Sequence, residues 1–277
     1  MKTVGWLLAM FWFVAAHAQS SRLPKYPPDR WDWQLQQYYK GANVKEVHLY
    51  RHRYDARGRL DKQSELVWTE VYNKRGNLVE RTDYDAGGKA KIKFDYSKRG
   101  VPMQCIITDG RGKVQERHLY RNGQLYRIMH YKEDEKRVAM LDEVVYKGDQ
   151  RELLRRNQLG APTHVTNSYF DPTGKFYFEK LFTVDEELVY DHRFLLTDEG
   201  QIRRMELRRP DENATPLAEY RYNEEGQRIE ARYYNDQGVL QTREVLKYDH
   251  RKLPTEKITY DAEGKPLMMD TYGYKRY

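Results

Sequence analysis

A five-residue phrase returns along this chain at a nearly constant spacing: a tyrosine, a small polar residue, two variable residues and a glycine. Three successive copies occupy residues 72–76, 84–88 and 96–100, so that their glycines fall 12 residues apart. Further copies occupy residues 222–226, 234–238 and 260–264. Internal repetition at a fixed period is the sequence signature of an array, in which one structural unit is used many times.

Each copy has the chemistry of a tight chain reversal. An Asp or Asn at the start of a turn accepts a hydrogen bond from its own backbone two residues on. Glycine adopts positive φ at no steric cost, as a short hairpin loop built on a type I turn requires. The glycines that we expect to close such turns are Gly58, Gly76, Gly88, Gly100, Gly112, Gly226, Gly238 and Gly264.

The segments between the turns have the pattern of strands. Subtracting the turn leaves about eight residues per repeat, a strand roughly 27 Å long. Lys89, Lys91 and Lys93 alternate with apolar residues, which is typical of a half-buried strand. The sequence therefore predicts an all-β fold. It is an extended antiparallel β-meander of about 12-residue repeats, curled or twisted into a single sheet, a shell or a solenoid.

The longer phrase Tyr–Asp/Asn–x–x–Gly–x–Leu, at residues 54–60 and 72–78, resembles the YD-repeat (RHS-like) proteins. The resemblance covers most of the chain from about Tyr50 onward. It implies long twisted β-sheets that curl into shells or spirals, and many such proteins carry toxins or adhesive modules. This chain is a short secreted member by this resemblance, without a recognisable self-cleaving segment or C-terminal effector domain. The resemblance thus implies a fold type and says little about activity.

Residues 1–18 are predicted to form a signal peptide. Lys2 provides a positive start, an apolar run of about 13 residues follows, and Ala16-His17-Ala18 is a small-x-small cleavage site. We expect cleavage after Ala18 and a periplasmic or secreted location. Because no later stretch approaches ~20 apolar residues, we expect no transmembrane segment in the mature chain.

The mature chain divides into two parts. Residues 19–43 are predicted to form a Pro- and aromatic-rich arm and cap, and residues 44–277 a single YD-like β-repeat domain. Trp31 and Trp33 fit a cap that covers the open end of the array, because terminal repeats must shield an exposed core. The alternative is an exposed aromatic patch, in which both residues contact a ligand or partner.

The charged residues alternate in sign, and the net charge is +7. Opposite charges on neighbouring strands stabilise a sheet modestly, so most of them are expected on solvated strand faces. Two basic stripes, Lys89–Lys91–Lys93 and Arg203–Arg204 with Arg208–Arg209, could serve nucleic acid, but we expect them to be solvated strand faces. Because the predicted signal peptide also removes the chain from most nucleic acid, we expect no nucleic-acid binding. An anionic envelope surface or an acidic protein partner fits the remaining charge better.

The single cysteine, Cys105, excludes an intramolecular disulfide and is expected to be a buried, inert thiol.

No motif of an enzyme, metal site or cofactor site occurs in the sequence. His48 and His52 would lie roughly 13 Å apart on a strand, too far to share a metal ion. We therefore expect no catalytic residue, cofactor or metal.

The first hypothesis is a non-catalytic protein-binding or scaffold subunit of the bacterial cell envelope, with an envelope protein as partner. In one version of this hypothesis, the chain docks on or plugs an outer-membrane secretion complex. The alternatives are a carbohydrate-binding module that uses Tyr/Trp stacking and a glycan hydrolase with paired carboxylates.

Overall fold

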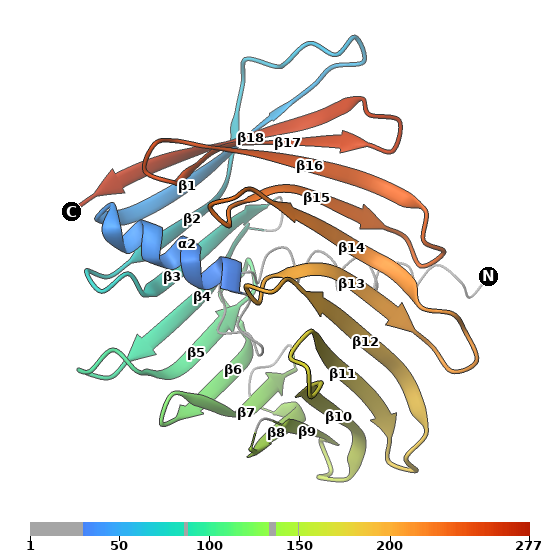
Figure 1. Cartoon of the computed structure of the whole chain (residues 1–277). Helices are drawn as coiled ribbons and strands as arrows, with labels where there is room; N and C mark the ends of the chain where they lie inside the picture. The colour runs from blue at the N-terminus through green and yellow to red at the C-terminus, as the bar shows by residue number, and fades with distance from the viewer. Residues whose placement is uncertain (1–29, 86–87, 133–136, 149) are drawn as a thin grey trace.

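The computed structural model describes residues 30–85, 88–132, 137–148 and 150–277 (Figure 1). The predicted signal peptide at 1–18 and the first part of the predicted arm, 19–29, lie outside these residues. Within these residues, helix α2 (Arg30–Gly41) precedes the first strand. The strands are β1 (Val44–Arg53), β2 (Glu65–Tyr72), β3 (Leu78–Asp85), β4 (Gly88–Tyr96), β5 (Pro102–Thr108), β6 (Val114–Arg121), β7 (Gln124–Tyr131), β8 (Val138–Lys147), β9 (Gln150–Asn157), β10 (Pro162–Phe170), β11 (Phe176–Thr183), β12 (Leu188–Leu196), β13 (Ile202–Arg208), β14 (Thr215–Tyr222), β15 (Arg228–Tyr234), β16 (Leu240–Tyr248), β17 (Pro254–Asp261) and β18 (Pro266–Arg276).

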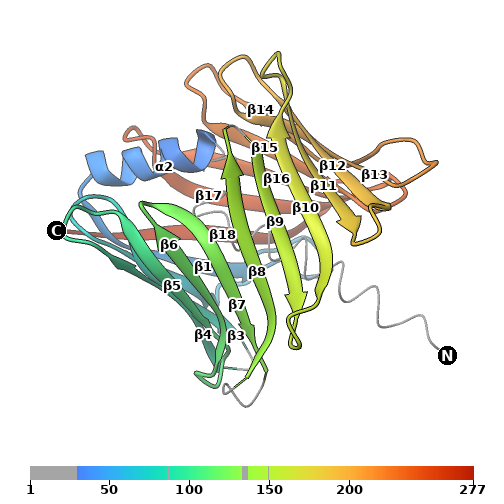
Figure 2. The ribbon, with the colours of Figure 1, turned by 90° about the horizontal axis from the view of Figure 1, so that it is seen from below.

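The strands form one antiparallel sheet that closes on itself. Each strand pairs with the next along the chain, and β1 also pairs with β18, where Val47 lies opposite Tyr274. The result is an 18-stranded barrel (Figure 2). The predicted all-β antiparallel meander in a single sheet is therefore confirmed, but an open sheet or a solenoid is wrong. In a solenoid each repeat contacts only its neighbours, whereas here the first strand hydrogen-bonds the last, which removes both sheet edges.

The reversals have the hydrogen bonds that the repeat predicts. Asn73 Oδ1 accepts from the backbone N–H groups of Arg75 at 2.9 Å and Asn77 at 3.2 Å. The Gly76 N–H donates to the Asn73 carbonyl oxygen at 2.8 Å. The eight glycines that the repeat places at turns all have positive φ, from 72° at Gly58 to 125° at Gly88. Each therefore adopts a backbone conformation that other residues rarely reach.

Tyrosines at strand ends tie neighbouring hairpins together. Tyr96 at the end of β4 donates its hydroxyl proton to the Leu78 carbonyl oxygen at the start of β3, at 2.7 Å. The same bond recurs from Tyr222 to Ile202, from Tyr248 to Arg228 and from Tyr274 to Pro254. The tyrosine of the repeat thus partly buries its ring and donates its hydroxyl proton to a backbone carbonyl group at the start of the preceding strand.

Helix α2 lies across one mouth of the barrel (Figures 1 and 2). Its Leu35 and Tyr39 are buried and belong to the same core cluster as Val47 of β1 and Tyr72 of β2. At the opposite side of this mouth, Gln34 accepts a hydrogen bond from Gln201 at 3.1 Å. Alternate reversals of an antiparallel ring lie at the same end, so the reversals after even-numbered strands form this α2 mouth. Among the residues that the structure describes, no helix is long and apolar enough to cross a membrane.

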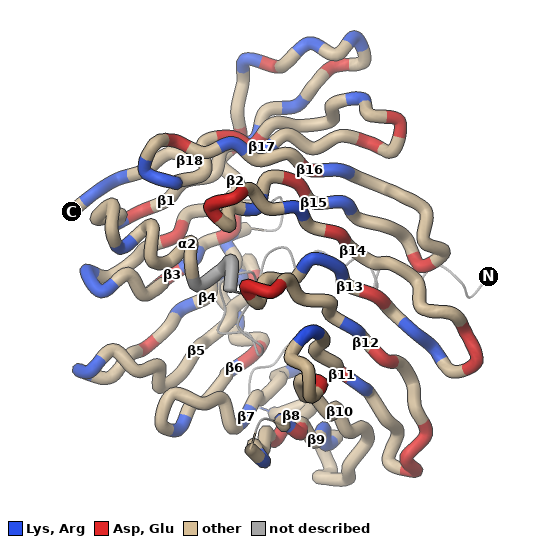
Figure 3. The backbone as a smooth tube through the Cα atoms, in the orientation of Figure 1, with Lys and Arg blue, Asp and Glu red and all other residues tan. Residues whose placement is uncertain are grey.

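The strand register divides the residues of the wall between an inner and an outer face. The inner face is the one that carries Val47 and Tyr72 beneath α2, and register fixes which residues of every other strand share it. On the outer face, charged residues pair across strands, as Lys91 does with Glu80 at 3.3 Å and Lys247 with Glu256 at 2.7 Å. Charges of both signs are distributed over the whole wall (Figure 3). A surface that faces lipid is apolar, so these outer faces suit water.

Candidate functional site

The inner face of β6–β9 carries a continuous cluster of ionisable side chains, which we call the inner network. It consists of Glu116 and His118 on β6, His130 on β7, Asp142 on β8 and Arg155 on β9. Glu116 lies opposite His130, and Asp142 lies opposite Arg155. Because residues that lie opposite each other point to the same face of a sheet, four successive strands place all five on one surface.

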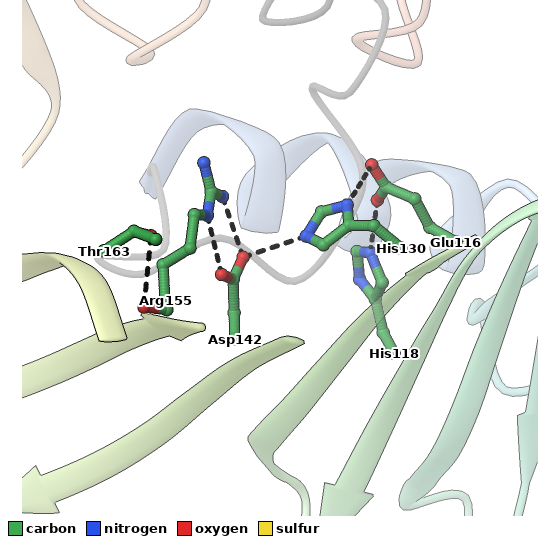
Figure 4. A network of polar contacts seen from close by, with 6 residues as sticks. All are labelled: Glu116, His118, His130, Asp142, Arg155 and Thr163. Carbon is green, nitrogen blue, oxygen red and sulfur yellow. Dashed lines mark hydrogen bonds and ion pairs between the residues drawn. The ribbon is translucent and has the colours of Figure 1, made fainter. Parts of the chain in front are cut away.

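The five side chains form an alternating chain of bases and acids (Figure 4). His118 Nε2 lies 2.8 Å from Glu116 Oε2, and His130 Nδ1 lies 3.2 Å from Glu116 Oε1. The other nitrogen of His130, Nε2, lies 2.9 Å from Asp142 Oδ2. Arg155 donates to both oxygens of Asp142, at 2.7 and 2.8 Å. This bidentate geometry is the strongest form of an arginine–carboxylate pair.

His130 is held in its protonated form. Burial by itself would lower the pKa of the imidazole, but the hydrogen bonds with Asp142 and Glu116 outweigh it and raise the pKa to about 9. A neutral imidazole has one N–H group, whereas both nitrogens of His130 face carboxylate oxygens. The imidazolium form therefore matches both contacts.

The carboxylates of the network stay ionised. Burial alone would raise the pKa of Glu116, yet the hydrogen bonds with His118 and His130 hold it well below its ordinary range. Asp142 is 1% exposed, and its pKa is likewise lowered because Arg155 and His130 overcome the effect of burial. With Glu116 and Asp142 ionised and His130 and Arg155 protonated, the four charges sum to zero. A buried charge set of this kind is tolerated because every charge has a partner.

The inner network lacks an activated nucleophile. Cys105 on β5 lies opposite His118 and is fully buried. Burial, and then the nearby carboxylates of Glu116 and Asp95, raise the pKa of the Cys105 thiol to about 12. The thiolate is the reactive form, and reactive cysteines have lowered pKa values. Cys105 is thus buried, as the sequence predicts, and its raised pKa favours an unreactive thiol.

A second inner-face cluster lies where the ring closes. Arg51 of β1 donates to both carboxylate oxygens of Asp270 on β18, at 2.8 and 3.0 Å. Lys257 of β17 lies 3.3 Å from Asp270 and 2.8 Å from Glu244. Asp270 is completely buried, and its pKa is lowered because Arg51 and Lys257 outweigh the effect of burial. These contacts stabilise the pairing of the first strand with the last.

The residues singled out in the sequence do not converge on a site. The eight turn glycines are divided between the two mouths of the barrel. Trp31 and Trp33 belong to α2 by their backbone, and the predicted contacts of their side chains fall outside what the structure describes. His48 contacts Thr69 and Glu46, whereas His52 contacts the carbonyl oxygen of residue 61, so the two histidines have separate partners.

Sequence reasoning missed the inner network, although the repeat contains a signal for it. His118, His130, Asp142 and Arg155 follow one another at intervals of 12, 12 and 13 residues. In an antiparallel meander with a period of about 12 residues, such an interval leads to the neighbouring strand, and it joins similar heights for residues near the strand centre, as His118 and Asp142 are. In the described part of the chain, no group of three or more His, Cys, Asp and Glu side chains is arranged to hold a metal ion.

No protein-family model matches this sequence, and no curated protein sequence matches it. Among solved structures, a porin-like protein from Bacteroides uniformis is similar with a TM-score of 0.48 and 10% identity, over 84% of this chain and 96% of that one. A porin-like protein from Bacteroides vulgatus has a TM-score of 0.39 and 9% identity, over 84% and 99%. A LolA superfamily protein from Nitrosomonas europaea has a TM-score of 0.25 and 11% identity, over 87% and 90%. At TM-scores below 0.5, these similarities carry no inference about function.

Proposed function

We propose that this chain is an exported, non-catalytic barrel protein that acts as a protein-binding or scaffold subunit of the bacterial cell envelope. The observation that carries the proposal is the inner network, in which each ionisable group is bonded to another group of the network. Export is supported by the sequence pattern of residues 1–18, which predicts a signal peptide. Binding is assigned to the outer surfaces and turns, because the ring of described strands is closed and leaves none of them a free edge to which a partner could add a strand.

The chemistry of the inner network supports the non-catalytic part of the proposal. A general base must be unprotonated at the working pH and within reach of a substrate proton. His130 instead is protonated at neutral pH, and both its nitrogens face carboxylates. Asp142 has both oxygens bonded to Arg155 and is shielded from solvent. The network is therefore suited to hold four strands in register.

We also propose that the chain is a short relative of the YD-repeat proteins. Support comes from the recurrence of one turn geometry with Asp or Asn at its start. Asp109 accepts from two backbone N–H groups, at 2.9 Å each, and Asn235 does so at 3.0 and 2.9 Å. A side chain that bonds the backbone two and four residues on explains why the polar residue and the glycine recur together.

The test uses the full chain, tagged at its C-terminus and expressed from its own gene in the source bacterium. Cells are cross-linked, fractionated and analysed by quantitative mass spectrometry, with an untagged strain as control. We expect the processed chain, beginning at Gln19, in the envelope fraction, together with one envelope protein in a near 1:1 ratio. An unprocessed cytoplasmic chain would contradict the proposal. So would purified protein that hydrolyses envelope glycans, or one whose specific ligand on a glycan array is a carbohydrate.

A further inference from the structure

Three neighbouring reversals of the α2 mouth carry cations and no carboxylate. We call these five residues the basic rim: Lys74 and Arg75 in the β2–β3 reversal, Lys98 and Arg99 in the β4–β5 reversal, and Arg121 at the β6–β7 reversal. All five side chains are exposed. Residues 73–77, 97–101 and 121–124 contain neither Asp nor Glu. The repeat therefore places a Lys–Arg pair at the same two positions of the β2–β3 and β4–β5 reversals.

The three reversals touch one another, so the basic rim is one surface. The Asn77 side-chain amide donates to the Gly100 carbonyl oxygen at 3.4 Å, and the Arg75 side chain lies against the same glycine. On the other side, the Val101 side chain packs against Gly123 of the β6–β7 reversal. Successive reversals at one mouth are two strands apart, roughly 9.5 Å. The cations thus form a row along the end of the barrel.

Two cations of the basic rim lie over aromatic rings: Lys74 over Tyr277, and Arg121 over Tyr126 with its guanidinium carbon 4.7 Å from the ring centroid. Elsewhere on the wall, cations pair with carboxylates across strands, as Arg156 does with Glu143 at 2.9 Å. Among the described residues, no carboxylate forms an ion pair with any cation of the basic rim. The acidic reversals of this mouth, with Glu199 and Glu225, belong to β12–β13 and β14–β15. Figure 3 shows the basic and acidic reversals at separate positions around the mouth.

Apolar side chains are exposed among these cations. Met103 is 50% exposed and Val101 37%. Tyr277, at the end of the chain, is 52% exposed, and the Lys74 ammonium lies 5.8 Å from the centroid of its ring. The nearby hollow of about 440 Å³ is shallow and lined by Ser97, Val101, Pro102, Met103, Tyr120 and Asn122.

We propose that the basic rim, with these apolar side chains, docks the protein on an anionic lipid surface. A cluster of Lys and Arg residues at one end of a protein is attracted to anionic headgroups, and the attraction is screened by salt. Apolar and aromatic side chains between the cations suit the boundary between headgroups and acyl chains. The proposal rests on the envelope location proposed above, where such lipids are available.

The shape of the rim favours lipid over an acidic protein. High-affinity protein interfaces are centred on aromatic or Arg anchors that fill well-packed pockets. The basic rim instead spreads its charges over the tips of three reversals, with a shallow hollow between two of them. A flat surface with dispersed negative charge meets all three tips together, whereas a compact acidic patch does not.

The test is sedimentation of the purified mature chain with vesicles of phosphatidylcholine alone or mixed with phosphatidylglycerol, at low and high salt. The rim variant carries Lys74→Glu, Lys98→Glu and Arg99→Glu. We expect wild type to bind the anionic vesicles only and to be released by salt. The rim variant should bind at least tenfold more weakly, because each substitution replaces an attraction by a repulsion.

The control variant carries Lys62→Glu, Lys89→Glu and Lys93→Glu, three exposed cations at the other mouth and on the outer face of β4. Its change in net charge is the same, and we expect wild-type binding. Circular dichroism of both variants checks that the barrel is intact. The proposal is overturned if both variants lose vesicle binding equally, or if wild type does not bind anionic vesicles. Binding of wild type to an acidic polypeptide but not to vesicles would overturn it too, and would assign the rim to a protein partner. Envelope fractionation tests the proposed function separately, so a lack of vesicle binding would not count against that function.

Discussion

The protonated His130 predicts a specific loss of stability in mild alkali. Its pKa of about 9 in the folded chain exceeds the ordinary value of 6.5 in the unfolded chain. A group with a raised pKa in the folded state binds its proton more tightly there, so folding is favoured while the proton is bound. This contribution is fully present below about pH 6.5 and is lost as the pH rises through about 9.

The size of the effect follows from the two pKa values. Their difference corresponds to about 3 kcal/mol at 1.36 kcal/mol for each tenfold change in proton affinity. The His130 side chain is 17% exposed, so solvent screens part of its interaction with Glu116 and Asp142. We therefore expect the free energy of unfolding to fall by about 1–3 kcal/mol between about pH 6 and about pH 10 from this residue alone.

The assay is urea unfolding of wild type and His130→Gln across this pH range, followed by tryptophan fluorescence. Other histidines titrate in both proteins, so the difference between the two curves isolates His130. We expect the variant to be less stable at pH 6 and the gap to narrow steadily toward pH 10. Two parallel curves, with a constant gap at every pH, would refute the assignment of the imidazolium to the inner network.

Three further predictions concern the repeat and the buried thiol. Gly88→Val should lower the free energy of unfolding by about 1–3 kcal/mol more than Gly112→Val. A side chain at Gly88 meets the Gly110 carbonyl oxygen, whereas one at Gly112 meets open space. Equal thermal unfolding of the two variants would contradict the turn geometry. Tyr96→Phe should cost about 1–2 kcal/mol in urea unfolding, because a backbone carbonyl group loses its partner. A fully stable variant would show that this bond contributes nothing. Cys105 should react with a disulfide reagent only after denaturation. With a pKa of about 12, roughly one Cys105 side chain in ten thousand is a thiolate at pH 8. Rapid labelling of the native protein would contradict the burial of Cys105.

The repeat predicts the local structure of the chain well. A polar residue that bonds the backbone and a glycine with positive φ act within five residues, so their pattern is visible in the sequence. The signal weakens where another residue takes the glycine's place, as Glu186 does with a φ of 65° and Lys252 with 66°. The turns persist there because the flanking strands are paired up to the turn, with Phe182 opposite Leu188 and Tyr248 opposite Pro254.

Closure of the ring and the inner network depend on distant residues. The pairing of β1 with β18 joins residues more than 200 positions apart, as Arg51 and Asp270 illustrate. Nothing in a 12-residue period says how many strands complete a turn of the barrel, because that number is set by strand tilt and stagger. The inner network was overlooked for a related reason: His130 and Asp142 are unremarkable in their own strands and become a cluster only when four strands are aligned.

The central claim, that the sheet closes between the first and the last strand, is tested most directly by an engineered disulfide. Tyr50 of β1 lies opposite Thr271 of β18, and opposed residues of antiparallel strands have Cα atoms about 4.5–5.5 Å apart, within disulfide range. In a Cys105→Ala background, the pair Tyr50→Cys and Thr271→Cys should form an intramolecular disulfide quantitatively under mild oxidation of the folded monomer. The control pair, Tyr50→Cys with Lys180→Cys on β11, should keep both thiols free. Free thiols in the β1–β18 pair, or only cross-linked dimers, would contradict the closed barrel.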